Sequence, residues 1–202
     1  MNLKKILGAI RAAFHGKTRD GVYVGHARTC DISYGYRMGA GFPGDVNRTH
    51  PASIEPTLID PSAPPTLYGQ AVVIDATSQG VRPLVAGDSS LTAIYGITVR
   101  PFPIQQQSST NYGASNVGSA TPPTSQPMDV LRAGYIMSTL SGSAAAVKGA
   151  PVFVWVAAST GTHIQGNFEA AATGGSTIQL DAKTTFNGPA DASGVCEIAF
   201  NI

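Results

Sequence analysis

The chain has 202 residues and a formal net charge of +1, and 12% of its residues are charged. An ordinary globular domain has roughly 25% charged residues. With 23 glycines and 14 prolines, this composition is typical of a turn-rich β protein that makes much of its contact through backbone and small side chains. The two cysteines, Cys30 and Cys196, are far apart in the sequence, which excludes a disulfide framework and fits a protein made in a reducing cytoplasm.

The small net charge hides an asymmetry along the chain. Residues 1–50 contain eight Lys or Arg and three acidic residues, so this part carries +5 and the remainder −4. A basic segment can contact nucleic acid, a membrane surface or an acidic protein. The aromatic residues that usually accompany a basic nucleic-acid-binding stripe are absent here. We therefore expect a protein partner, and neither nucleic acid nor a membrane.

Residues 1–20 are predicted to form a basic amphipathic helix that ends at Gly16. Arg11 interrupts its apolar run too early for a signal peptide or a membrane span. A helix of this kind either folds back on its own core or docks on a partner or a membrane surface. Its apolar residues recur at helical spacing: Leu3, Ile6, Leu7, Ile10 and Phe14.

Residues 21–202 are predicted to form a β-rich body with two long loops. The loops, 39–69 and 101–129, are rich in Pro and Gly, and such long loops in compact domains are either functional or disordered. The first contains several apolar residues that need cover, so we expect it to lie extended on a surface. The expected strands lie in the segments 21–27, 29–38, 70–76, 80–86, 92–100, 130–140, 151–158, 176–182 and 194–202.

Alternation is clearest in two of these strands. In 92–100, one face is predicted to carry Ala93, Tyr95, Ile97 and Val99. In 194–202, the residues expected on one face are Cys196, Ile198, Phe200 and Ile202, with Glu197 and Asn201 on the other. About nine short strands joined by glycine turns predict a single β-sandwich or barrel.

Motifs that resemble catalytic or cofactor sites do not have the required context. The "GAGFPG" motif at 39–44 contains a proline and is not followed by a helix, so it does not predict a phosphate site. The "AGDSSL" segment at 86–91 resembles a hydrolase nucleophile block, but between two β segments it is better explained as a turn. A hydrolase built on Ser89 or Ser90 remains an alternative.

Metal-binding and acid–base motifs are also missing from the sequence. The four histidines are isolated, and no two acidic residues are spaced as an acid–base pair. The sequence therefore predicts no catalytic, cofactor or metal residues, and we expect a protein that is not an enzyme.

Three segments resemble a known protein family: "SYGYRMGAGFPGDVNR", "GQAVVID" and "AIYGITVRPFP". Together they are similar to the structural cement, or capsid decoration, proteins of tailed bacteriophages, of the kind found on large myoviral heads. The resemblance is firm over roughly residues 30–107. It implies a jelly-roll-like body on the outer surface of the virion, placed where subunits of the major capsid protein meet. It also implies a protein without a cofactor that is made in the host cytoplasm.

This resemblance gives a function to the stiff segment after the strand at 92–100. A proline-rich extended arm loses little conformational freedom when it docks on a partner. The expected contacts are Phe42, Pro43, Arg100, Pro101, Phe102, Pro103 and Ile104, together with the apolar residues of the N-terminal helix. The expected partners are the major capsid protein and further copies of the chain, as a dimer or trimer.

A tail or fibre protein that binds carbohydrate or other virion proteins is the alternative function. Such a protein would be expected to offer exposed aromatic platforms and repeated motifs. The single tryptophan, Trp155, lies within an apolar segment and is predicted to be buried. The capsid function is therefore favoured.

Overall fold

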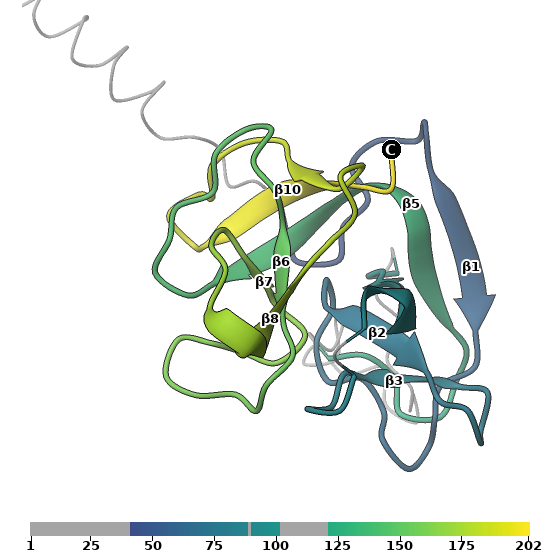
Figure 1. The fold of residues 1–202 in the computed structure, drawn as a ribbon. Coiled ribbons are helices and arrows are strands. Elements are labelled where there is room, and N and C mark those ends of the chain that lie inside the picture. Colours follow the sequence, from purple (N-terminus) through teal and green to yellow (C-terminus); the bar gives the residue numbers. More distant parts are fainter. Residues whose placement is uncertain (1–40, 89, 102–120) are drawn as a thin grey trace, which may run out of the picture. The chain divides into compact units, whose positions relative to one another are not determined.

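The computed structural model describes residues 41–88, 90–101 and 121–202, and Figure 1 shows them in colour. The chain divides into two compact units, Met1–Met38 and Gly39–Ile202, and every described residue belongs to the second. The described residues of this unit are mainly β-structure, with two single-turn 3-10 helices, η2 (Leu91–Ala93) and η3 (Gly174–Ser176). Its strands are β1 (Ser53–Thr57), β2 (Ala71–Ile74), β3 (Val81–Pro83), β4 (Ile94–Thr98), β5 (Met128–Ser141), β6 (Phe153–Trp155), β7 (Phe168–Glu169), β8 (Thr177–Gln179), β9 (Thr185–Phe186) and β10 (Val195–Phe200).

The strands within the described residues form one mixed sheet. Its main path runs β3-β2-β4-β5-β7-β6-β8, with β1 and β10 also paired to β5, and β9 paired to β10. All pairings between these strands are antiparallel except that of β5 with β7. The mainly β class is thus confirmed, while the jelly-roll arrangement stays a prediction.

The long strand β5 organises the sheet because it pairs with four other strands. Its first part, 128–133, lies between β1 and β4. Its middle part, 134–139, pairs with β10, and its last two residues pair with β7. Figure 1 shows β5 alongside β1 at one end and alongside β10 at the other. The change of partner falls at Gly134, whose φ of 143° is a conformation that L-residues with side chains rarely adopt.

Hydrophobic residues are buried on both faces of the β2–β4–β5 region, as the alternation of strand side chains requires. Val73 and Leu131 belong to the larger core, whereas their neighbours Val72 and Val130 belong to a smaller one. The chain that follows β1 covers the smaller core with Ile59 and Tyr68. The larger core extends to the other end of the sheet and includes Ile97, Ile136, Val154, Phe168, Phe186, Cys196, Ile198 and Phe200.

The expected face of β4 is confirmed for three residues and wrong for the fourth. Ile97 and Val99 lie in the larger core and Ala93 packs against it, but Tyr95 packs against the smaller core. The pairing of β2 with β4 shifts register at this point, because Val72 is opposite Gly96 while Val73 is opposite Ile94. The resulting β-bulge turns Tyr95 to the opposite face.

Strand β10 also follows its predicted alternation until its last residues. Cys196, Ile198 and Phe200 are buried in the larger core, while Ile202 is exposed. The strand ends at Phe200, and Asn201 takes a left-handed conformation with φ of 53°, which breaks the period. Burial raises the pKa of the Cys196 thiol to about 12.

The first long segment, 39–69, contains one strand that the sequence did not predict. Strand β1 lies within it and is paired to β5, although almost all of its side chains are exposed. In the chain that follows β1, Ile59 and Tyr68 lie in the smaller core, whereas Leu58 and Leu67 are exposed. The surface-bound path of the whole segment stays a prediction. The predicted N-terminal helix and the strands expected at 21–27 and 29–38 lie outside the described residues.

Among the described residues, β1 pairs only with β5, so its other side forms an edge of the described sheet, and its proline is placed accordingly. The N–H of Val99 donates to the carbonyl of Asp129, so the polar backbone groups of Asp129 face β4. Successive residues of an antiparallel strand bond to opposite neighbours. Pro56, which is opposite Asp129 in the β1–β5 register, therefore directs its backbone away from β5. The N–H that proline lacks is a donor that would have faced the open edge.

Candidate partner-binding surface

Two segments that were predicted separately as contact sites meet in the fold, namely the turn at 42–45 and the end of β4. The N–H of Arg100 donates to the carbonyl of Gly44 at 2.8 Å. On its other side, the N–H of Gly44 donates to the carbonyl of Met137 at 2.7 Å, and the N–H of Met137 donates to the carbonyl of Asp45 at 2.9 Å. The turn is therefore fixed by backbone bonds to both Arg100 and β5.

The sequence Phe42–Pro43–Gly44–Asp45 explains why this turn forms. Pro at the second position and a residue with positive φ at the third are typical of a type II turn, and Gly44 has φ of 89°. The N–H of Asp45 donates to the carbonyl of Phe42 at 3.0 Å. In return, the N–H of Phe42 donates to Oδ2 of Asp45 at 3.2 Å.

The Phe42 side chain is presented to solvent by this turn and is 63% exposed. The guanidinium carbon of Arg100 lies 4.4 Å from the centroid of its ring, which is a cation–π contact. Arg100 also lies 3.6 Å from the Asp45 carboxylate. The aromatic ring and the cation thus form one surface unit, which we call the Phe42–Arg100 patch.

A small cavity of about 100 Å³ lies next to the smaller core, and Tyr68 and Met128 belong to both. Tyr68 connects it to the patch, because a Cβ on Gly44 would lie only 2.7 Å from the Cβ of Tyr68. Burial raises the pKa of the Tyr68 phenol, against a lowering by the charge of Arg100. The cavity is lined by Tyr68, Val99, Pro101, Pro123, Pro127, Met128 and Asp129.

The predicted contact residues divide into two groups. Within the described chain, the structure brings Phe42 and Pro43 next to Arg100, and it places Pro101 in the neighbouring cavity. The other predicted contacts lie outside the described residues: Leu3, Ile6, Leu7, Ile10, Phe14, Phe102, Pro103 and Ile104. Sequence reasoning missed Tyr68 and Asp45 as parts of this surface. The Asp after "FPG" was the available signal for the second of them, because Asp commonly caps tight turns.

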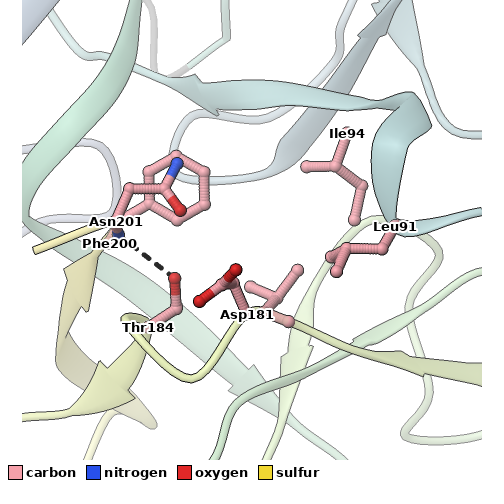
Figure 2. A pocket seen from close by; sticks show the side chains of 7 residues that line it. Leu91, Ile94, Asp181, Thr184, Phe200 and Asn201 are labelled. Carbon is pink, nitrogen blue, oxygen red and sulfur yellow. Dashed lines mark hydrogen bonds between the residues drawn. The ribbon is translucent and has the colours of Figure 1, made fainter.

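A second cavity, of about 270 Å³, lies between the start of β4 and the end of β10. Figure 2 shows Leu91 and Ile94 on one side of it and Phe200 and Asn201 on the other, with Asp181 between them. Leu180 and Thr184 complete the lining. None of these residues belongs to the Phe42–Arg100 patch.

A polar cluster fastens the chain just before β1 to strand β10. The Glu197 carboxylate accepts hydrogen bonds from Asn47 at 2.6 Å, from Arg48 at 2.8 and 3.1 Å, and from Asn187. Arg48 also lies over the ring of Tyr135, with 4.1 Å to its centroid. Burial opposes ionisation, but the three donors outweigh it and lower the pKa of Glu197.

Glu169 and His163 form a third group of polar residues, and their contacts hold the fold together. Glu169 is almost fully buried and lies 2.6 Å from Nδ1 of His163, whose ring stacks on that of Trp155. Trp155 is itself buried, as predicted. No cluster of His, Cys, Asp and Glu within the described residues could hold a metal ion, and no helix among them is long and apolar enough to cross a membrane.

The turn that was expected at 86–91 is present in its described part. The Asp88 carboxylate accepts a hydrogen bond from the N–H of Val85 at 2.8 Å and from Arg82 at 2.7 Å. The hydrogen bond from Arg82 lowers the pKa of Asp88, against an opposing effect of burial. The Asp88 carboxylate is therefore bound by Arg82 and Val85, two residues that precede the turn.

The sequence matches the XM1 gp53 minor capsid protein family over residues 32–200, which is most of the chain. The chain belongs to this family. Its resemblance to capsid-associated proteins of tailed bacteriophages is thus confirmed, and the family is one of structural proteins of the virion. No curated protein matches the sequence significantly. That the chain is not an enzyme accords with a structural family and otherwise stays a prediction.

A solved structure has a fold similar to that of the present chain. A chain of "The capsid of Myoviridae Phage XM1" superimposes with a TM-score of 0.59 and 19% sequence identity. The match covers 82% of the present chain and 92% of the XM1 chain. At this identity the likeness concerns the fold alone.

Proposed function

We propose that the chain binds the outside of the major capsid protein shell across subunit junctions and stabilises the mature head. The observation that carries this proposal is the Phe42–Arg100 patch, an exposed aromatic ring held in a fixed position on a minor capsid protein. Aromatic and arginine side chains are the residues most enriched at binding hot spots. A rigid pair of this kind is well suited to a permanent protein contact.

The patch gains binding energy because it is already ordered before it docks. Burying a phenylalanine side chain fully contributes about 1.5–3 kcal/mol. Desolvation on binding would strengthen the existing Arg100 contact from about 0.5–1 kcal/mol to roughly 2 kcal/mol. The turn that presents Phe42 is held by three backbone hydrogen bonds to Arg100 and Met137, so little further conformational entropy is lost on binding.

The proline-lined cavity next to the patch offers a place for a partner side chain. Its volume of about 100 Å³ suits a single apolar side chain. Anchors that fill pockets close to an exposed aromatic residue commonly supply most of the energy of an interface. In this proposal Phe42 enters the shell protein, and one shell side chain enters the cavity beside Tyr68.

The predicted contacts outside the described residues would extend this interface. The N-terminal helix and the segment with Phe102, Pro103 and Ile104 are each proposed to add apolar anchors on neighbouring subunits. A dimer or trimer of the chain would match the symmetry of the shell and engage several subunits at once. Linked contacts of modest strength then act together through effective concentration.

Stabilisation in this proposal is a matter of mass action and involves no reaction. A protein that binds only the mature, expanded shell favours that state by an amount that grows with its free concentration over its Kd. Decorated heads should therefore melt at a higher temperature than bare heads. Equal melting temperatures at saturation would argue against a stabilising role.

The first experiment is co-sedimentation of the full-length chain with bare, expanded shells, titrated to saturation. A simple ratio to the major capsid protein at saturation is the expected result. Phe42→Ala should weaken binding about 10-fold, which corresponds to about 1.4 kcal/mol. Val147→Ala is the matched control, because Val147 is also 63% exposed but lines neither cavity.

Two outcomes would contradict the proposal. If the wild-type chain does not sediment with shells, shell binding itself is refuted. If Phe42→Ala and Val147→Ala bind as tightly as the wild type, binding occurs through some other surface than the patch. Thermal unfolding measures the folding stability of both variants. If the two variants lose the same amount of folding stability, a difference between them in shell binding is a binding defect and not a folding defect.

A further inference from the structure

The larger of the two cavities has an apolar floor that belongs to the main core. Leu180 and Phe200 are almost completely buried and form part of this core. Ile94 packs against the same core, while Leu91 is 40% exposed at the rim (Figure 2). A ligand with an aliphatic part would thus contact a hydrophobic surface that is continuous with the interior.

The polar wall of the cavity is supplied partly by Asn201, whose backbone N–H and side-chain amide each donate one hydrogen bond within the protein. Its backbone N–H donates to Oγ1 of Thr184 at 3.1 Å, and its side-chain Nδ2 donates to the carbonyl of Arg132 at 3.0 Å. These bonds hold Asn201 in its left-handed conformation. The side-chain oxygen, Oδ1, and the second N–H of Nδ2 remain for a ligand.

Asp181 supplies the charge of the polar wall. One of its carboxylate oxygens, Oδ1, accepts a hydrogen bond from the N–H of Lys183 at 2.9 Å. Figure 2 shows the carboxylate directed into the space between Asn201 and Leu91. No Lys, Arg or His within residues 41–88, 90–101 and 121–202 forms an ion pair with Asp181.

We propose that this cavity binds a lysine or arginine side chain of a neighbouring shell subunit, an inference that rests on the proposed function. The groups left for a ligand include the Asp181 carboxylate and the Asn201 amide oxygen, which accept hydrogen bonds from a cation, and the negative charge of the carboxylate disfavours an anion. Long cationic side chains place their aliphatic stems on apolar surface and their charged heads on polar groups. Leu91, Ile94 and Phe200 fit the stem, and Asp181 with Asn201 fits the head.

Charge complementarity decides between this occupant and a purely apolar one. An apolar side chain would leave the Asp181 carboxylate without a counter-charge and reduce its contact with water, which is costly. A bound cation removes that cost by forming a charge-assisted hydrogen bond. The cavity, at about 270 Å³, also accommodates a whole long side chain.

The first test measures binding to the cavity directly on the full-length chain. Backbone amide NMR shifts are followed during titration with Nα-acetyl-L-arginine methylamide and the corresponding lysine compound. The expected result is a saturable change at Leu91, Asp181 and Asn201. The neutral norleucine compound should bind at least 5-fold more weakly, and Asp181→Asn should weaken the arginine compound by a similar factor.

The matched control is Lys183→Gln, which alters a charge in the same loop without touching the proposed contact. It should leave the affinity for the arginine compound within about twofold of the wild type, since its side-chain charge is not part of the cavity. Asp181→Asn keeps Oδ1 as an acceptor for the Lys183 N–H, so the turn is retained. Equal binding of the arginine and norleucine compounds would overturn the proposal.

The second test asks whether the cavity is used on the shell. Asp181→Asn should lower the affinity for bare shells about 3- to 10-fold and Asp181→Lys should lower it further, while Lys183→Gln has no such effect. If Phe42→Ala weakens shell binding and neither Asp181 variant does, this inference falls and the proposed function stands. If the wild-type chain does not bind shells, both fall.

Two further measurements would reveal another occupant of the cavity. Tighter binding of putrescine than of the arginine compound would indicate a free polyamine and overturn the proposal. Analytical ultracentrifugation measures self-association of the chain. If Asp181→Lys loses self-association but keeps shell binding, the occupant is a second copy of the chain and the proposal is overturned as well.

Discussion

Gly44 and Tyr68 approach so closely that no side chain other than hydrogen fits between them. A Cβ on Gly44 would lie 2.7 Å from the Cβ of Tyr68 and 2.9 Å from the backbone nitrogen of Arg100. The close contact seats the turn that presents Phe42 against the end of β4. The surface patch therefore depends on a glycine that does not itself contact a partner.

Gly44→Ala is expected to destabilise the protein by about 2 kcal/mol or more. The substitution introduces both a steric contact and a strained positive φ, and backbone strain of this kind alone costs about 1–3 kcal/mol. Urea denaturation of the variant measures the loss. Gly87→Ala is the control, because a Cβ there would meet nothing within 4 Å. A variant at Gly44 as stable as that control would show that the turn can open without cost.

The Glu197 cluster is expected to make stability depend on pH in the acid range. The folded pKa of Glu197 is lowered, so the carboxylate stabilises the fold at pH values above its unfolded pKa of about 4.3. This contribution is lost as the pH falls through the lower folded pKa. Glu197→Gln should be less stable at pH 7 by about 1–3 kcal/mol, the range for hydrogen bonds to charged groups.

The measurement for Glu197 is the free energy of unfolding from urea titrations between pH 7 and pH 3. The difference between Glu197→Gln and the wild type should shrink toward pH 3. Asp129→Asn is a suitable control, since its side chain is exposed on β5. A constant difference at every pH would mean that the charge of Glu197 does not contribute.

Ser138 is expected to tolerate loss of its hydroxyl group. Its Oγ is buried and has no hydrogen-bond partner in the described structure. Ser138→Ala should leave the free energy of unfolding unchanged or raise it by up to about 1 kcal/mol, because an unpaired polar atom leaves the interior. Ser141→Ala on the same strand should cost about 1 kcal/mol, since Ser141 accepts a hydrogen bond from Asn167 at 3.0 Å. Thermal unfolding compares the two, and a clear loss in Ser138→Ala would contradict this expectation.

Strong alternation predicted the main strands, and weak or short patterns did not. The "AIYGITV" and "GVCEIAF" segments form β4 and β10 because one apolar face is buried in each. Strand β1 reads "SIEPT", has no buried face and contains a proline, so its pairing with β5 left no pattern in the sequence. Strands β7 and β9 have two residues each, which is too short for any periodicity. The register shift that turns Tyr95 toward the smaller core is a tertiary effect of the β2 pairing.

The components of the candidate site were predictable, but their meeting was not. "FPG" indicates a turn with an exposed aromatic residue, and "RPFP" indicates the end of a strand. Their contact depends on Gly44 lying between Arg100 and Met137, which only the pairing of β4 and β5 creates. The larger cavity could not be predicted, because Asp181 and Leu91 approach only in the folded chain.

The outward-facing proline of β1 has a consequence for the period before assembly. A virion component is synthesised in many copies, and free strand edges at high concentration tend to join into aggregates. Pro56 leaves that edge with carbonyl groups but removes a donor that a continuous ladder between two molecules would need. We therefore expect pairing of β1 with β1 between two copies to be disfavoured, which would limit aggregation before the chain joins the virion.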